Sequence, residues 1–319
     1  MSHQFWTYIL DRLTRKHPVI LLCVVESQGS SPGRQGYKMA VAADGMAGSI
    51  GGGIMEHKFA EMAKEKLRSI PENPQIRKQV HNRDAPQNRS GMICSGEQTI
   101  VLFHLTDAHA GAVKAIAASL HGGGGGHVKI TPDSFSFSPE SPADDFSFVM
   151  KDETDWSYRE KVGFKNKLYI VGGGHCSLAF SRLMSGMDFQ IHLFENRKDL
   201  NTLEQNTYVH TKTIVDDYAD LKDRIPPGSD TYVVIMTFGY RTDDEAYRSL
   251  YKSDYKYIGL LGSKSKIQKM REEWKASGIP DERTKLLHAP IGLSINSRTP
   301  EEIAISIAAE IIGVKNQAG

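Results

Sequence analysis

One stretch constrains this chain more than any other: residues 168–180, which read LYIVGGGHCSLAF. The apolar run that opens it predicts a buried strand, three glycines follow at once, and the rest predicts a helix. A helix start of this kind favours a phosphate, because the first N–H groups lack internal partners and the helix dipole is positive there. We therefore expect Gly172, Gly174 and His175 to contact a phosphate-bearing cofactor.

A second predicted strand, residues 189–194, ends in Glu195. The distance in sequence from Gly172 to Glu195 is close to the roughly 20 residues that separate the glycine turn from the ribose-binding acid in dinucleotide folds. This spacing predicts a Rossmann-like βαβ unit in which Glu195 binds the cofactor. Ser177 stands where the pattern has its third glycine, and it is small enough for close helix–strand packing. The alternative is a glycine turn that binds no nucleotide, since fold does not fix function.

Length and composition set further bounds. The 319 residues favour two domains, for which we predict the ranges 1–160 and 161–319. A formal net charge of +1 argues against nucleic-acid binding, and no apolar run reaches the roughly 20 residues that a membrane span needs. No secretory signal is evident. The three cysteines, Cys23, Cys94 and Cys176, are far apart, which argues against a disulfide framework or a zinc site and fits a reducing cytoplasm.

The remaining patterns predict an α/β chain. In the first half we expect helices at 4–16, 55–68 and 108–120, strands at 19–25 and 98–105, a hairpin around Asp44-Gly45, a loop at 71–89, and a second hairpin from 134–138 and 145–150. In the second half we expect strands at 231–236 and 257–261, and helices at 242–253, from 264 to 277 and after Thr299. Thr242 with Glu245, and Thr299 with Glu302, have the spacing of capping boxes.

A second glycine turn precedes a predicted helix in the N-terminal half. Gly51, Gly52 and Gly53, with Glu56 and Arg34 nearby, could hold a phosphate or another oxyanion. The alternative is that the glycines serve only backbone conformations with positive φ. A Walker loop is excluded, because no Gly-Lys-Ser/Thr sequence follows.

Two thiols and a basic group could also carry chemistry. Cys94 lies in a glycine-flanked loop where a thiolate could bind a transition metal, although free cysteine is more often a small buried residue. Cys176 could be reactive at a helix start. His175 falls near the predicted strand ends with three cations, Lys264, Lys266 and Arg298, of which the lysines are more simply a solvated helix start. The sequence shows no pattern of a self-contained hydrolase and no further catalytic residues.

Together these motifs resemble the XdhC/CoxI family, the accessory proteins of xanthine dehydrogenase and related molybdenum hydroxylases. The resemblance covers nearly the whole chain. It is carried by Gly29-Ser-Ser-Pro32, the Asp44-Gly45 turn, Gly48-Ser-Ile-Gly-Gly-Gly53 with Glu56, Cys94, Gly172-Gly-Gly-His175, Gly259-Leu-Leu-Gly-Ser263, Pro290-Ile-Gly-Leu293 and Arg298-Thr-Pro-Glu-Glu-Ile-Ala304.

The resemblance implies a mixed α/β XdhC/CoxI-type N-terminal domain and a Rossmann-like C-terminal domain with a mainly parallel sheet. It implies a carrier without turnover of its own, which binds the molybdenum cofactor (molybdopterin), protects it while a cysteine desulfurase adds the terminal sulfido ligand, and delivers it to the xanthine dehydrogenase apoenzyme. By the same analogy we expect a homodimer. From the motifs themselves we expect Cys94 as a metal ligand and two glycine-lined anion sites that face one cleft. NAD(P) is a further cofactor that the βαβ unit allows.

The chain also departs from the family pattern. Ile54 replaces a cysteine, and Phe238 and Tyr240 replace two histidines, so one thiol and two imidazoles are missing. Two rival functions therefore stay open. One is an enzyme, either an NAD(P)-dependent oxidoreductase or a subunit of the dehydrogenase, although three scattered cysteines cannot ligate iron–sulfur clusters. The other is a nucleotide-sensing module that regulates partner docking.

Overall fold

The structure, a computed structural model, describes residues 3–68, 73–80, 96–140, 142 and 144–317. Cys94 lies outside these ranges. The chain divides into two compact units, Met1–Gly163 and Phe164–Gly319, and each is described by itself. Among the described residues, no helix combines the length and apolar character that crossing a membrane requires.

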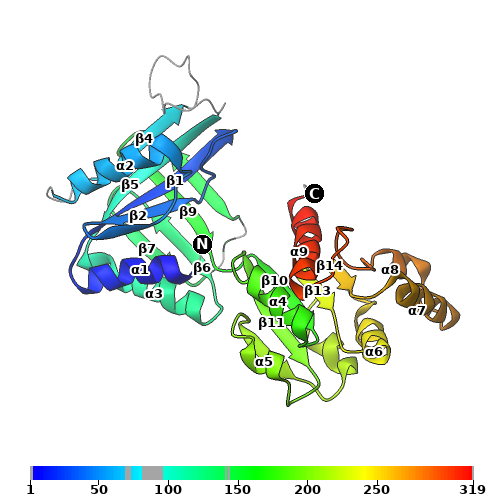
Figure 1. Ribbon diagram of the computed structural model, residues 1–319. Coiled ribbons are helices and arrows are strands. Elements are labelled where there is room, and N and C mark those ends of the chain that lie inside the picture. The colour runs from blue at the N-terminus through cyan, green and yellow to red at the C-terminus, as the bar shows by residue number, and fades with distance from the viewer. Residues whose placement is uncertain (1–2, 69–72, 81–95, 141, 143, 318–319) are drawn as a thin grey trace. The chain divides into compact units, whose positions relative to one another are not determined.

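The N-terminal unit contains two antiparallel sheets (Figure 1). The first has the order β3-β2-β1-β5-β4, with strands β1 Val19–Gly29, β2 Lys38–Ala42, β3 Gly45–Gly48, β4 Gln75–Val80 and β5 Gly96–Leu105. The second has the order β7-β6-β9-β8, with strands β6 Gly126–Ile130, β7 Phe135–Ser138, β8 Phe146–Met150 and β9 Trp156–Val162. The helices are α1 His3–Thr14, α2 Gly53–Lys66 and α3 Ala110–His121, and a 3₁₀ turn, Asp107–His109, precedes α3.

The first seven residues of strand β1, Val19–Val25, are buried on both faces. Leu21 and Cys23 pack in the core that the first sheet shares with α1, α3 and the second sheet, whereas Leu22 and Val24 pack in a separate core under α2. Successive side chains of a strand point to opposite faces, so a strand covered on both sides needs apolar residues at every position. This is why the predicted strand at 19–25 has an almost unbroken apolar sequence.

Two predictions for this unit are wrong. Residues 71–89 were expected to form a loop, but Gln75–Val80 is strand β4, which pairs with β5 at the edge of the first sheet. Its solvated side chains hide the strand pattern. The segments 134–138 and 145–150 are both strands, yet they do not form a hairpin with each other, because β6 and β9 lie between them. The hairpin at Asp44-Gly45 is confirmed.

The C-terminal unit has one parallel sheet in the order β12-β11-β10-β13-β14 (Figure 1). Its strands are β10 Asn166–Val171, β11 Phe189–Glu195, β12 Thr211–Ile214, β13 Gly228–Ile235 and β14 Tyr255–Leu260. The helices are α4 His175–Met184, α5 Asn201–Gln205, α6 Tyr240–Leu250, α7 Lys264–Ala276, α8 Asp281–Lys285 and α9 Pro300–Asn316, with a 3₁₀ segment at Tyr218–Asp223. Helices α4 and α9 share one core with the sheet and α6 and α7 another, as expected for a doubly wound Rossmann fold.

The two predicted capping boxes have different outcomes. At α9 the box is confirmed: Thr299 accepts from the Glu302 N–H, and the Glu302 carboxylate accepts in return. At α6 the prediction is wrong, because the helix already begins at Tyr240, with Gly239 as its N-cap, so Thr242 lies inside the first turn. In the turn before α6, the N–H and the hydroxyl of Thr237 instead donate hydrogen bonds to the carboxylate of Asp243.

Candidate functional site

The candidate site of the C-terminal unit is the edge where its parallel strands end. Strand order reverses between β10 and β13, and ligands of such sheets bind at this point, outside the carboxyl ends of the strands. Helix α4 starts directly after β10 and α6 shortly after β13. Their N-caps are Gly174 and Gly239, and no described side chain caps either helix. Both helix starts therefore present N–H groups and a positive dipole at the same edge.

The glycines of this edge have different roles. Gly172 has φ +107°, and a Cβ placed there would lie 2.4 Å from the Met236 carbonyl oxygen, so the fold requires glycine where the two turns touch. Gly174 has φ −73° and would meet nothing within 4 Å. Gly239 has φ −165°, and the nearest atom, the Thr242 hydroxyl oxygen, is 4.0 Å away. The fold does not require glycine at either N-cap, and its presence leaves open space over both helix starts.

Glu195, predicted to bind the cofactor, is fully buried. Its Oε2 accepts from the Gly173 N–H (2.6 Å) and from Arg197 Nη2 (2.9 Å). Its Oε1 accepts from the N–H groups of Asn196 and Arg197 (both 3.0 Å) and from Arg197 Nε (2.8 Å). These bonds fill the roughly four lone-pair sites of a carboxylate. Glu195 ties the glycine turn to β11, and a ribose hydroxyl could reach it only if one of these bonds broke.

The charge of Glu195 follows from the same contacts. Burial raises the pKa of its carboxyl, but the hydrogen bonds from Arg197 and from the Gly173 amide outweigh burial, so the pKa lies below its ordinary value. The guanidinium of Arg197 lies 4.7 Å above the exposed ring of Phe238. The prediction did not include Arg197, although an arginine that follows the second strand of a Rossmann unit is a known signal of phosphate recognition.

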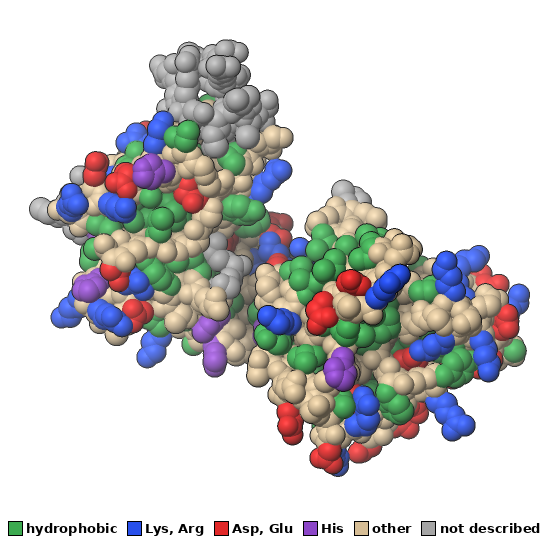
Figure 2. Space-filling model, in the orientation of Figure 1, with side chains coloured by type: hydrophobic (Ala, Val, Ile, Leu, Met, Phe, Trp, Pro, Cys, Tyr) green, Lys and Arg blue, Asp and Glu red, His purple; other side chains and the backbone are tan. Residues whose placement is uncertain are grey.

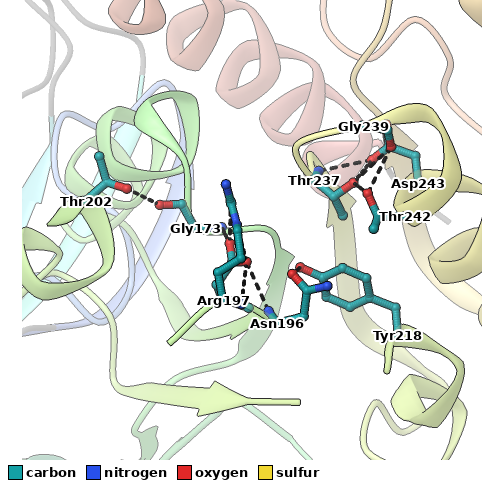
Figure 3. A network of polar contacts seen from close by, with 10 residues as sticks. Gly173, Asn196, Arg197, Thr202, Tyr218, Thr237, Gly239, Thr242 and Asp243 are labelled. Carbon is teal, nitrogen blue, oxygen red and sulfur yellow. Dashed lines mark hydrogen bonds and ion pairs between the residues drawn. The ribbon is translucent and has the colours of Figure 1, made fainter. Parts of the chain in front are cut away.

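A second network ties the turns after β13 and β14 together. Asp243 is fully buried, accepts from Thr237 and forms an ion pair with Lys266. Burial raises the pKa of Asp243, and Lys266 and Thr237 oppose that shift. Lys266, expected as a solvated helix start, therefore has a structural role, while Lys264 and Arg298 are exposed. Figure 3 shows the Gly173 and Arg197 group on one side and the Thr237–Asp243 group on the other.

His175 is exposed as the first residue of α4. It borders a groove of about 560 Å³ between α4 and α9, where hydrophobic side chains gather on the viewed face (Figure 2).

Cys176, the next residue of α4, is partly buried. Burial, and to a smaller extent the charge of Glu301, raises the pKa of its thiol, which is the opposite of what a reactive thiolate needs. Ser177, at the third glycine position, is fully buried as close packing demands.

In the N-terminal unit, the carboxylate of Glu56 already binds the N–H groups of the second glycine turn. Gly51, Gly52 and Gly53 have φ of +127°, +76° and +69°. The Glu56 carboxylate accepts from the N–H groups of Ile50 and Gly52, both at 2.9 Å. Burial raises the pKa of Glu56, but hydrogen bonds from Ser49 and these amides outweigh it and lower the pKa overall. A phosphate on these two amides would have to displace the carboxylate.

The loop at 29–36 packs directly on this turn. A Cβ at Gly51 would lie 2.6 Å from the Gly33 N–H nitrogen, so the two segments that the sequence singled out are in contact. Buried Gln98 bonds to both segments: its Oε1 accepts from Ser31 (2.8 Å) and from the Gly33 N–H (3.2 Å), and its Nε2 donates to the Ile50 carbonyl (3.4 Å), a role that sequence patterns did not reveal. Arg34 is exposed and donates to the Gly29 carbonyl at 3.1 Å.

No group of three or more potential metal ligands occurs among His, Cys, Asp and Glu in the described ranges. The predicted metal ligand, Cys94, lies outside them. The prediction that the two glycine turns face one cleft concerns both units and stays a prediction.

The fold and this edge define a protein of two units, of which the C-terminal one has the doubly wound parallel sheet of Rossmann folds. Comparison with known proteins supports this class. The profile of the XdhC Rossmann domain matches residues 168–311, and that of the XdhC and CoxI family matches residues 13–72. The chain belongs to the XdhC and CoxI family.

Three similar proteins show how far the likeness extends. An uncharacterized Escherichia coli (strain K12) protein, YqeB, is 27% identical over 94% of this chain, which spans only 44% of YqeB. A Bacillus subtilis (strain 168) protein named as a probable xanthine dehydrogenase subunit is 20% identical, with 98% of each chain covered. A crystal structure of a Bacillus halodurans xanthine dehydrogenase has a TM-score of 0.73 at 22% identity, covering 100% of this chain and 97% of that one. This structural likeness shows the fold.

Proposed function

We propose that this chain is an accessory protein of xanthine dehydrogenase that works in the cytoplasm. It binds the molybdenum cofactor, protects it while a cysteine desulfurase adds the sulfido ligand, and delivers it to the apoenzyme. Family membership and a relative of almost equal length that is named for the dehydrogenase support the association with the enzyme. The observation that carries the binding role is the pair of open, glycine-capped helix starts where β10 and β13 end.

The described residues fit one end of this cofactor. Its phosphate suits the N–H groups at the start of α4, where Gly174 leaves space that a Cβ would fill. The described residues supply no cluster that could hold molybdenum, so the soft ligand in this proposal is the thiolate of Cys94. When bound, the cofactor supplies the molybdenum centre that the apoenzyme lacks. The role of this chain is to bind it, orient it and exclude water.

A carrier also needs a surface for its partner. The groove between α4 and α9 is lined largely by apolar side chains, and Ile305 on its rim is 53% exposed. Its charged members are Arg182 and Glu301. An apolar centre with a charged rim is the usual composition of a protein interface. We assign this groove to the apoenzyme, and we expect the carrier to be a homodimer.

The names of two relatives favour a second candidate, a permanent subunit of the dehydrogenase. Such a component would copurify with the active enzyme in equal amounts, whereas a carrier would leave the enzyme once the cofactor is transferred. Size-exclusion chromatography of the mature enzyme with this chain separates the two.

Binding is tested by anaerobic titration of the purified chain with the molybdenum cofactor. We expect one cofactor per chain, and at least about tenfold weaker binding by Cys94→Ala, since loss of a metal–thiolate bond exceeds the loss of one ordinary contact. Cys176→Ala, a thiol kept protonated by burial, is the matched control and should bind as the wild type does. Equal affinity of Cys94→Ala and wild type would remove Cys94 from the site, and absence of binding would contradict the proposed function.

A further inference from the structure

Arg197, just after the end of β11, has N–H donors that its partner Glu195 does not use. A guanidinium has five N–H donors, and Glu195 engages two of those on Arg197, one on Nε and one on Nη2. That leaves three without a partner among the described residues. The Arg197 side chain is 37% exposed and its next neighbour, Lys198, is exposed as well. The two contacts to Glu195 hold the guanidinium in one orientation, so little entropy is lost when it binds a ligand.

This arginine lies beside the glycine turn. Strands β10 and β11 are parallel neighbours with Val171 opposite Phe194, so the turn after β10 and the residues after β11 meet at the same edge. The bond from the Gly173 N–H to Glu195 joins them directly. A nucleotide whose diphosphate lies on the start of α4 would therefore carry its ribose toward Glu195 and Arg197.

The chemistry of that end discriminates between two kinds of ribose. An unmodified ribose is recognised through its hydroxyls by an acid with free lone pairs, and the buried, fully bonded Glu195 offers none. A phosphorylated ribose is recognised by a fixed guanidinium, which Arg197 provides. One face of the guanidinium rests on Phe238, so the opposite face can stack on a base.

We propose that this sheet edge binds a nucleotide whose ribose carries a phosphomonoester, the chemistry of an NADP(H)-type ligand, and that Arg197 sets the preference over the unphosphorylated form. The diphosphate lies at the start of α4, the ribose phosphate on the free edge of Arg197, and the base against its outer face. The inference rests on the proposed function only in using the same edge, where the nucleotide and the molybdenum cofactor would compete for the start of α4.

Isothermal titration of the full chain with adenosine 2′,5′-bisphosphate and with 5′-AMP isolates the extra phosphate, and NADP⁺ with NAD⁺ repeats the comparison in the intact dinucleotide. In each pair, the ligand with the 2′-phosphate should bind at least about tenfold more tightly than the ligand without it. Tenfold corresponds to the contribution of one charge-assisted contact. Equal affinities within the pairs, or no binding of any of the four at millimolar concentration, would overturn the proposal.

Substitution locates the preference. Arg197→Gln should abolish it and weaken 5′-AMP only by the lost stacking on the guanidinium, whereas Arg197→Lys should keep part of the preference. Arg248→Gln is the matched control, because Arg248 has nearly the same exposure (36%) and also pairs with an acid, Asp244, on helix α6. A preference that survives Arg197→Gln would contradict the assignment. Should that variant not fold, the wild-type comparison still decides. The molybdenum cofactor is absent from these titrations, so their failure is distinguishable from failure of the accessory function.

Discussion

Replacing Lys38 with methionine is expected to destabilise the N-terminal unit by about 3–5 kcal/mol. Lys38 is 1% exposed and forms an ion pair with buried Glu160, and it also donates to the Gly36 carbonyl at 2.9 Å. Tyr158 donates to the other Glu160 oxygen at 2.6 Å. Lys38 lies on β2 and Glu160 on β9, so the pair connects the two sheets. Methionine fills a similar volume but leaves the carboxylate without its charge partner.

Urea denaturation of a Trp274→Phe background measures this effect, because the remaining tryptophans, Trp6 and Trp156, both report on the N-terminal unit. Lys151→Met is the matched control. Its partner is also an acid, Asp155, but both side chains are well exposed, so the change should be below about 0.5 kcal/mol. Removing both buried charges, in the double variant with Glu160→Leu, should recover much of the loss. A Lys38→Met effect no larger than that of the control would contradict the argument.

Gly174→Asp is expected to weaken binding of phosphate-bearing ligands about a hundredfold while the C-terminal unit stays as stable or gains about 1 kcal/mol. Gly174 is the N-cap of α4 and has an extended conformation, which suits aspartate. The carboxylate of the introduced aspartate would then accept hydrogen bonds from the N–H groups that a phosphate needs. In the other unit, Glu56 accepts from the amide of Gly52 in a similar way. The negative charge also repels the ligand.

Gly174→Ser separates charge from size, because serine can cap the helix and adds no charge. We expect its effect on binding to lie between those of wild type and Gly174→Asp, with thermal unfolding showing both variants folded. If Gly174→Asp binds the molybdenum cofactor and nucleotides as the wild type does, the start of α4 is not the phosphate site.

Much of the fold follows from local sequence, because a strand, a glycine turn and a helix are coded within about 13 residues around Gly172. The cap of α9 and the hairpin at Asp44-Gly45 are local in the same sense and were predicted correctly. Strand β4 and the pairing of β6 with β9 were not, since they depend on neighbours far away in the chain. Strand pairing is decided by such tertiary contacts more than by propensity.

In the candidate site, too, local features were predicted from the sequence and contacts between distant residues were not. The glycine turn and Glu195 were located from their spacing, but spacing alone did not show that Glu195 is buried and bonded to Arg197. The buried contacts of Gln98, and the pairing of Asp243 with Lys266, join residues that are distant in sequence. A polar residue of this kind looks like a solvated one until its partner is known.

Transfer of cofactor is the most direct test of the central claim. The chain would be loaded anaerobically with sulfurated molybdenum cofactor, separated from unbound cofactor and mixed with a xanthine dehydrogenase apoenzyme, and xanthine oxidation would be followed. The loaded chain should restore activity in proportion to the cofactor it carries and faster than free cofactor at the same concentration, whereas the cofactor-free chain should restore none. Activation by free cofactor at the same rate with and without the chain would contradict a role as carrier.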